Sequence, residues 1–395
     1  MNIEDRITST LSGTLNTLDG TPGDLEAVHR TGERLRTRRR ALVGGVAAAV
    51  VALVVAGTLV VRGDEPSEVE PAPAGGSWEP LPDLPLAPRS SPVTAWTGSE
   101  VLVVGGYLTV CPANADCINP EELARDGAAY DPRTDEWREI ADAPVELAGY
   151  FRSAMVGDTL VLFDGRDSWF GYDVSDDEWR ELPGPGQPAA DMGSLTSSED
   201  GFVYTLSRSG RILALNVDER RWAVIPDAVH EEAETVVVTP GGFVVSAGPG
   251  EEKVVTQIMG YDFETVETGQ FNPFRHWTGE RLVELDLQVL ENDDGTTTPY
   301  GGRLDPATGE WSPLPNQPKE SGDGWSPNAA DGPLLAGWGY VYNDSDGSWT
   351  RLERPDGATA DHGYGAVWGD GDLFVLGGVA HHGEPTAEAW IWRRE

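Results

Sequence analysis

The chain has 395 residues, enough to bury a large core, and carries 66 acidic against 28 basic side chains. The excess is uneven: residues 1–40 hold seven Arg and six acidic residues, a net charge of +1, and the remainder holds 21 basic and 60 acidic residues, a net charge of −39. Such a balance excludes nucleic acid and anionic lipid headgroups as partners of the acidic part. Cations, basic proteins and neutral glycans remain as partners, unless the acidic excess serves solubility alone.

Residues 1–40 are predicted to form a cytoplasmic tail that is partly helical or disordered. Ile3, Ile7, Leu11 and Leu15 follow helical spacing, but the apolar residues are too few to form a core. The tail would therefore fold only against a cytoplasmic partner, or it would serve only to orient the chain in a membrane.

Residues 41–61 form a run of 21 residues without a charge, which predicts a transmembrane helix. At 1.5 Å per residue the helix is about 31 Å long, close to the thickness of a bilayer core. Five Arg residues precede the run, and acidic residues follow Arg62. Because the basic side stays in the cytoplasm, the C-terminal part is expected outside the cell membrane. A cleaved signal segment ending at Ala56 is the alternative.

Residues 62–76 are rich in Pro, Glu, Ala and Gly and are expected to form a disordered stalk. From residue 77 to residue 395 one pattern recurs, in which an aromatic or apolar residue and an acidic or amide residue precede a turn and a Trp. The markers of this pattern are Trp78, Trp137, Trp179, Trp222, Thr268 in a degenerate copy that starts at Tyr261, Trp311 and Trp349.

An apolar run that usually ends in Gly precedes each marker, as in Val101–Gly106 and Leu373–Gly378. Such a run predicts an inner strand covered on both faces, with Gly allowing close approach where blades crowd a central channel. The Asp would bond nearby amides in the turn, and the Trp would pack against the next blade. Sheets of this kind cannot bury both faces alone and must stack in a ring.

Seven units follow from the markers, so an all-β, seven-bladed β-propeller is predicted, with six or eight blades as alternatives. The last unit has material for three strands, and Trp78–Leu81 is expected to supply the fourth and close the ring.

The Gly-Gly after a strand and the Tyr130-Asp131-Pro132-x-Thr134-x-x-Trp137 pattern resemble the kelch repeat family over roughly residues 78–395. Blades three and four depart from the pattern, because both lack the Gly-Gly pair and blade four lacks the Trp. The resemblance implies a propeller with four strands per blade and a binding face made of loops. It implies no particular ligand, because kelch propellers serve enzymes and adaptors alike.

The two cysteines, Cys111 and Cys117, lie in a long insertion of blade one, residues 107–126. Outside the membrane a local disulfide is expected, and the loop that it closes is a candidate recognition element. Galactose oxidase, an enzyme with kelch repeats, uses a copper site that includes a Cys joined to a Tyr. Because both cysteines here share one loop, no such site is expected.

Two acidic loops, residues 291–295 and 344–347, have ligands that Ca²⁺ prefers, but neither completes an EF-hand and both are interpreted as hairpin turns. His381 and His382, with Glu384, form a weak metal candidate and are interpreted as solvated loop residues. No phosphate loop, nucleophile elbow or zinc-protease motif is present, so no catalytic residue, cofactor or metal is assigned.

The leading hypothesis is a membrane-anchored, extracytoplasmic propeller that binds a protein, peptide or glycan and is not an enzyme. The layout of tail and helix also resembles membrane proteins of high-GC Gram-positive bacteria that are encoded beside sigma factors. That resemblance implies, as the alternative, a transmembrane sensor that acts on a cytoplasmic regulator through residues 1–40, although the zinc-binding signature of anti-sigma proteins is absent. A propeller hydrolase or lyase is the second alternative.

Overall fold

The computed structural model describes residues 75–109, 122–147, 152–164, 168–186, 194–198, 201–207, 209–228, 233–247, 254–260, 265–270, 276–291, 297–318 and 325–394. These residues form strands and turns, and all of them belong to one compact unit. The predicted tail, membrane helix and most of the stalk lie outside them. No helix in the described part is long and apolar enough to cross a bilayer.

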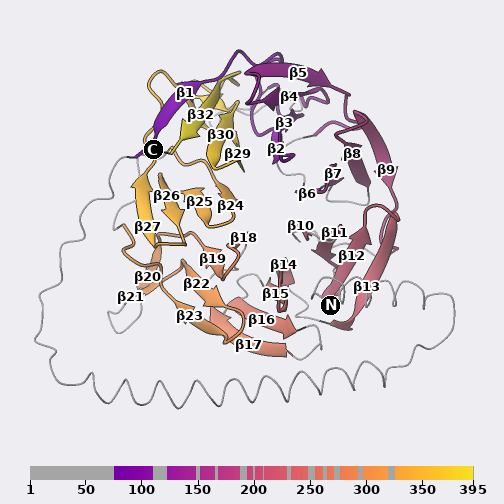
Figure 1. Cartoon of the computed structure of the whole chain (residues 1–395), viewed down its shortest axis with the longest axis vertical. Helices are drawn as coiled ribbons and strands as arrows, with labels where there is room; N and C mark the ends of the chain where they lie inside the picture. Colours follow the sequence, from indigo (N-terminus) through magenta and orange to yellow (C-terminus); the bar gives the residue numbers. More distant parts are fainter. Residues whose placement is uncertain are drawn as a thin grey trace, which may run out of the picture. The chain divides into compact units, whose positions relative to one another are not determined.

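Seven four-stranded antiparallel sheets make up most of the described chain and surround a common axis (Figure 1). This arrangement confirms the all-β propeller with seven blades and removes the alternatives of six and eight. Blade one contains β2 (Val93–Trp96), β3 (Val101–Val104), β4 (Gly127–Asp131) and β5 (Glu136–Ile140), and blade two contains β6 (Arg152–Val156), β7 (Thr159–Phe163), β8 (Trp169–Asp173) and β9 (Glu178–Leu182). Blade three contains β10 (Thr196–Ser197), β11 (Phe202–Leu206), β12 (Arg211–Asn216) and β13 (Arg221–Ala228). Blade four contains β14 (Ala233–Thr239), β15 (Gly242–Ala247), β16 (Val254–Gly260) and β17 (Thr265–Gln270).

The remaining three blades contain two insertions. Blade five contains β18 (His276–Trp277), β19 (Leu282–Glu284), β22 (Gly302–Asp305) and β23 (Glu310–Ser312). Blade six contains β24 (Ala329–Asp331), β25 (Leu334–Gly337), β26 (Tyr340–Asn343) and β27 (Ser348–Arg351). Blade seven contains β29 (Gly365–Gly369), β30 (Asp372–Leu376), β32 (Ala389–Arg393) and β1 (Ser77–Pro80). The inserted two-stranded sheets are β20 (Val289–Glu291) with β21 (Thr297–Pro299), and β28 (Ala360–His362) with β31 (Val379–Ala380).

The ring closes where the N-terminal strand completes the last blade. Strand β1 pairs antiparallel with β32, with Ser77 opposite Arg393 and Pro80 opposite Trp390. The closure predicted from Trp78–Leu81 is therefore confirmed. Its effect is that the last blade has no missing strand and the two ends of the ring are held by backbone hydrogen bonds.

The Gly-ended apolar runs form the second strand of their blades, and all four residues of β3 are buried. Residues such as Leu102 and Leu162 pack between neighbouring sheets, which confirms that these strands are covered on both faces. Each such side chain stabilises the fold by roughly 1.5–3 kcal/mol.

The Trp of the outer strand packs against the preceding blade, so the prediction that it packs against the next blade is wrong. Trp179 of β9 packs with residues of the first blade, and its indole N–H donates to the carbonyl oxygen of Ala141, the residue after β5. Five blade boundaries show this indole hydrogen bond: Trp137 to Pro82 O at 3.0 Å, Trp179 to Ala141 O at 2.8 Å, Trp222 to Pro183 O at 2.5 Å, Trp349 to Pro315 O at 2.7 Å and Trp78 to Glu353 O at 2.7 Å.

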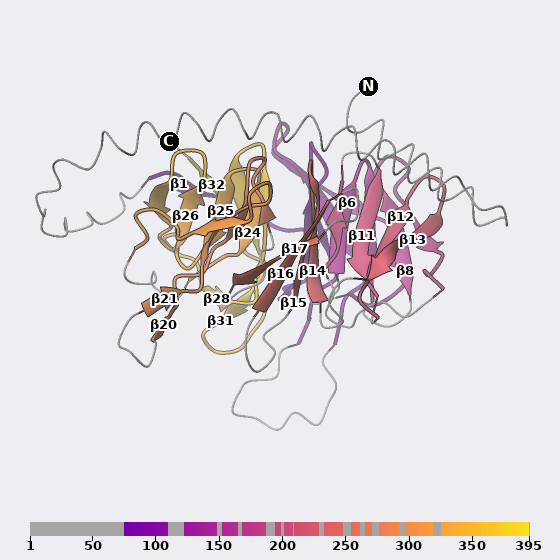
Figure 2. The same ribbon diagram turned by 90° about the horizontal axis from the view of Figure 1, so that it is seen from below.

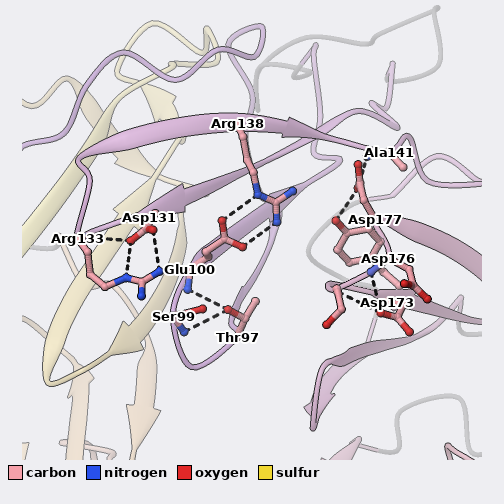
Figure 3. Close-up of polar contacts among 12 residues, drawn as sticks. Thr97, Ser99, Glu100, Asp131, Arg133, Arg138, Ala141, Asp173, Asp176 and Asp177 are labelled. Carbon is pink, nitrogen blue, oxygen red and sulfur yellow. Dashed lines mark hydrogen bonds and ion pairs between the residues drawn. The ribbon is translucent and has the colours of Figure 1, made fainter.

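The motif turn between third and fourth strands is built as predicted, with the Asp side chain accepting amide hydrogen bonds. The Asp131 carboxylate accepts the N–H of Arg133 at 2.9 Å, and that of Asp173 accepts the N–H groups of Ser175 and Asp176 at 3.1 Å (Figure 3). The last turn residue has a positive φ, at Asp135 and Asp177, a conformation that Asp tolerates.

A buried Tyr on the third strand ties each of these turns to its sheet. Tyr130 donates its hydroxyl to Asp135 at 2.7 Å, and Tyr172 donates to Asp177 at 2.8 Å. Burial and the neighbouring Asp raise the pKa of both phenols well above the ordinary value, so both remain donors. Asp177 also accepts the N–H of Ala141, at the end of the preceding blade (Figure 3).

Blade four differs from blade one in the pairing of its marker. In blade one Trp137 stands opposite Tyr130. In blade four Thr268 pairs with Thr256, and the last described pair is Met259 with Thr265. The strands of this blade are six or seven residues long.

Candidate interaction surface

Five short segments, from the first and last parts of the propeller sequence, form a bridge across the joint between the last blade and the first. Antiparallel pairs join β28 to β31, Val379 to Pro385, Arg89 to Thr386, Ser90 to Tyr107 and Tyr107 to Leu123. We call residues 89–91, 105–109, 122–126, 360–363 and 378–386 the junction platform. It combines the connections between the second and third strands of the first and last blades with segments that precede the first strands of these two blades.

Arg89 is the centre of the junction platform and is fully buried. Its guanidinium donates to Gly105 O at 2.9 Å, to Ala87 O at 2.9 Å and to both carboxylate oxygens of Asp126 at 2.9 and 3.1 Å. A paired fork of this kind is the geometry in which a buried guanidinium is best satisfied. The Asp126 side chain is 44% exposed, so the pair reaches from the core to the surface.

The backbone of Arg89 joins the first strand's connection to the last blade. Its N–H donates to Thr386 O and its carbonyl oxygen accepts the N–H of Gly378, both at 2.9 Å. Arg89 therefore contacts three parts of the chain. They are the segment between β1 and β2, the root of the blade-one insertion and the loop of blade seven.

The glycine pair that ends β3 is required by this packing. Gly105 and Gly106 have φ of 65° and 107°, and a Cβ at these positions would lie 2.4 Å from Leu147 O and 2.9 Å from Ser90 O. The close approach is to Leu147, in the segment after β5, and to Ser90, in the connection before β2.

The root of the blade-one insertion is a short antiparallel ladder. Leu108 donates its N–H to Glu122 O at 2.8 Å, and the hydroxyl of Thr109 accepts the N–H of Glu122 at 2.9 Å. Residues 110–121, with the predicted disulfide between Cys111 and Cys117, lie outside the described residues. The insertion thus leaves the junction platform from a defined base.

The histidine loop also belongs to the junction platform. His381 is 88% exposed and its Nδ1 lies 3.2 Å from Asp361, which in turn accepts a bond from Arg354 at 2.8 Å. Burial works to raise the pKa of Asp361, but the hydrogen bonds and charges of Arg354 and His381 lower it overall. His382 stacks edge-on against His381, and Glu384 forms a turn through its backbone.

Within the described part of the chain, no three His, Cys, Asp or Glu side chains lie close enough to hold a metal ion.

Residues 344–347 form the β26–β27 turn, as predicted, and Asp344 is buried there. Its carboxylate accepts hydroxyl bonds from Thr278 at 3.0 Å and Tyr342 at 3.1 Å, and it pairs with Arg281 at 3.3 Å. Because these groups occupy its carboxylate oxygens, Asp344 has a structural role. In the other acidic loop, residues 292–295 lie outside the described residues.

Sequence reasoning found the insertion and the His pair but missed Arg89 and β28–β31. The only signal for Arg89 is its place just before the first inner strand, within Pro88-Arg89-Ser90-Ser91-Pro92. A single Arg in a Pro-rich connection does not reveal that three distant segments meet around it.

No model of a known protein family matches the chain. Among curated proteins, the Kelch-like protein terF of Aspergillus terreus (strain NIH 2624 / FGSC A1156) is 23% identical over 245 residues. The match covers 54% of this chain and 52% of the fungal protein, so the chain spans about half the length of that relative. With seven four-stranded sheets, this similarity supports a propeller of the kelch type.

Proposed function

We propose that this kelch-type propeller is an interaction protein that binds a partner protein through the junction platform and the insertion that rises from it. The observation that carries the proposal is the construction of this surface: a fully buried Arg89 and backbone pairing among five segments support the root of a long insertion. Loops placed on a rigid scaffold are the usual carriers of recognition.

The side chains at the surface of the junction platform suit binding and not chemistry. Glu122, His362, His381, His382 and Glu384 are exposed, and the buried guanidinium of Arg89 is used in structural bonds. Lys253 and Lys319, the two lysines of the chain, lie elsewhere in the sequence. The partner surface is accordingly neutral or basic.

We further propose that residues 41–61 anchor the chain in the cell membrane, with residues 1–40 in the cytoplasm and the propeller outside. The apolar run, the Arg cluster before it and the acidic character of the remainder support this placement. The disulfide between Cys111 and Cys117, which requires an oxidising compartment, belongs to the same proposal.

The test compares two versions of the full chain as bait in native membranes: the natural chain, and one in which residues 110–121 are replaced by a short Gly-Ser linker. The proposal expects a specific partner to be recovered by the first and lost with the second, because the ladder at Leu108 and Glu122 preserves the root. Equal recovery by both baits would contradict it.

Placement is tested separately with a membrane-impermeant amine-reactive or thiol-reactive label on intact cells. Labelling of a tag at the C-terminal end from outside, together with no labelling of an N-terminal tag, is expected. The reverse pattern would contradict the anchor orientation.

A further inference from the structure

A second projecting feature lies on blade five and is separate from the junction platform. Between β19 and β22 the chain leaves the sheet for residues 285–301, which we call the blade-five arm, and there β20 and β21 form a hairpin. Figure 1 places this hairpin at the outer rim, away from the central axis, and Figure 2 shows the same hairpin from below. A two-stranded hairpin is at best marginally stable by itself.

The root of the blade-five arm is fixed to the propeller. The indole N–H of Trp338 in blade six donates to Leu285 O at 2.9 Å, and Leu285 and Leu287 pack against the buried cluster that contains Leu335 and Tyr342. The Asp286 carboxylate accepts the N–H of Gln288 at 2.8 Å. The hairpin is therefore held in one direction although its strands lie outside the blade.

The hydrogen-bond pattern shows which backbone groups point outward. Tyr300 donates its N–H to Gln288 O at 3.0 Å, so these residues form a hydrogen-bonded pair. In an antiparallel ladder such pairs alternate with pairs whose N–H and C=O groups point away from the partner strand. Those outward residues are Val289 and Glu291 on β20, and Thr297 and Pro299 on β21.

The two outer edges of the hairpin are not equivalent. Pro299 has no N–H, so the edge of β21 lacks a donor where a further strand would pair. The edge of β20 has donors and acceptors at both Val289 and Glu291, and in the described part of the chain its sheet contains no third strand. The hairpin thus offers one edge for pairing, and that edge belongs to β20.

Four outer strands of the blades carry features that oppose such pairing. Strands β5 and β9 each carry two Glu and one Arg, β13 contains Pro226 and β1 contains Pro80. Charge and proline on an edge strand discourage the addition of another strand. Val289 of β20, by contrast, is 49% exposed, the one large apolar side chain of the described residues that is exposed in this way.

The charge of the blade-five arm indicates the chemistry of a partner. Glu291 ends β20, Asp293 and Asp294 follow it in sequence, Glu284 and Asp286 precede β20, and residues 285–301 contain no Lys or Arg. A segment that adds to β20 would be attracted if basic and repelled if acidic.

We propose that the edge of β20 binds an extended, basic segment of a partner protein as a third strand of the hairpin. Backbone groups of Val289 and Glu291 pair with the segment, and an apolar residue of the segment covers the Val289 side chain. This surface is independent of the partner proposed for the junction platform.

The test measures binding of a labelled peptide of alternating valine and lysine to the full chain by fluorescence anisotropy. Val289→Pro removes one outward N–H from the β20 edge, and Thr297→Pro, the matched control, removes one from the β21 edge. Neither change touches a hydrogen bond inside the hairpin, because both positions point outward. The natural chain and Thr297→Pro are expected to bind equally, and Val289→Pro at least about tenfold more weakly.

A second measurement does not depend on the folding of any variant. The same peptide with methyl groups on alternate backbone nitrogens keeps its charge but loses the donors of one edge, and it is expected not to bind the natural chain. Hydrogen exchange should slow at the amides of Val289 and Glu291 when the unmodified peptide binds. Equal binding of the methylated peptide, equal binding by Val289→Pro, or no binding to the natural chain would each overturn the proposal.

Discussion

Trp78 donates its indole N–H to the carbonyl oxygen of Glu353 at 2.7 Å, although 275 residues separate the two along the chain. The ring of Trp78 also packs edge-on against Trp325, with centroids 5.0 Å apart. The first described strand is thus fastened to the sixth blade by the same kind of bond that joins consecutive blades elsewhere in the ring. Ring closure therefore repeats an ordinary blade boundary.

Replacing Trp78 by Phe keeps an aromatic ring and removes the N–H. The expected loss is about 1 kcal/mol in the free energy of unfolding, because Glu353 O loses a protein donor. Urea unfolding checks it. Trp390→Phe is the control, since that indole bonds only to Glu388 two residues away, at 3.3 Å. A larger loss in the control than in Trp78→Phe would contradict the role of the boundary bond.

Replacing Arg89 by Met is expected to destabilise the propeller by about 3–5 kcal/mol, because Gly105 O and Ala87 O lose their donor and Asp126 its partner. Asp126→Asn should cost much less, since Asp126 is 44% exposed and water can replace part of the pair. Denaturant midpoints of the two variants check the order. Equal losses would show that the ion pair, and not the buried bonds, dominates.

His276 predicts a pH dependence of stability. Its Nε2 lies 2.7 Å from Gly332 O across the boundary between blades five and six, and burial lowers its pKa from 6.5, with the Gly332 bond and the charges of Asp331 and Asp344 opposing. The unfolded chain therefore binds the proton first as the pH falls. Stability is complete above pH 6.5 and decreases below it.

The check compares urea midpoints of the natural chain and His276→Gln at about pH 7.5 and about pH 5. Gln keeps a donor for Gly332 O but does not titrate, so its stability should fall less, by at most about 2 kcal/mol over this range. The carboxylates titrate alike in both proteins, so the difference between their two pH profiles reports the titration of His276. Parallel pH profiles would contradict the assignment.

Replacing Tyr172 by Phe removes the hydroxyl that bonds Asp177 and leaves the ring in the core. A loss of about 1–2 kcal/mol in the free energy of unfolding is expected, because the Asp177 carboxylate keeps only the N–H of Ala141 at that oxygen. Tyr130→Phe, the equivalent change in blade one, should give a similar loss through Asp135. No loss in either variant would mean that water replaces the hydroxyl at no cost.

The sequence predicts the ring because each blade repeats local chemistry. An Asp that bonds amides two residues on, a Trp next to the turn and a Val-rich run act within a few residues, so their spacing reveals the blades. Closure by Trp78–Leu81 could be predicted for a related reason, since the last unit lacks one strand. The strand pairing of blade four could not be predicted, because Thr268 offers neither a Trp nor a turn residue to fix it.

The interaction surfaces were harder to predict because they depend on contacts between residues that are not neighbours in the sequence. Arg89 matters only once Gly105, Asp126 and Thr386 are brought around it. The edge of β20 depends on which groups point outward, and thus on the bond between Tyr300 and Gln288. A polar stretch such as residues 285–301 looks like an ordinary loop until that bond is known.

The pairing of Ser77 with Arg393 has a practical consequence for rearranging the molecule. Cross-strand partners lie about 5 Å apart, so a linker of a few residues would join these two points without disturbing β1 or β32. New ends could then be opened at the turn formed by residues 306–309, where residues 307 and 308 are exposed. Such a circular permutant would keep the strands of every blade while its first and last residues moved from blade seven to blade five.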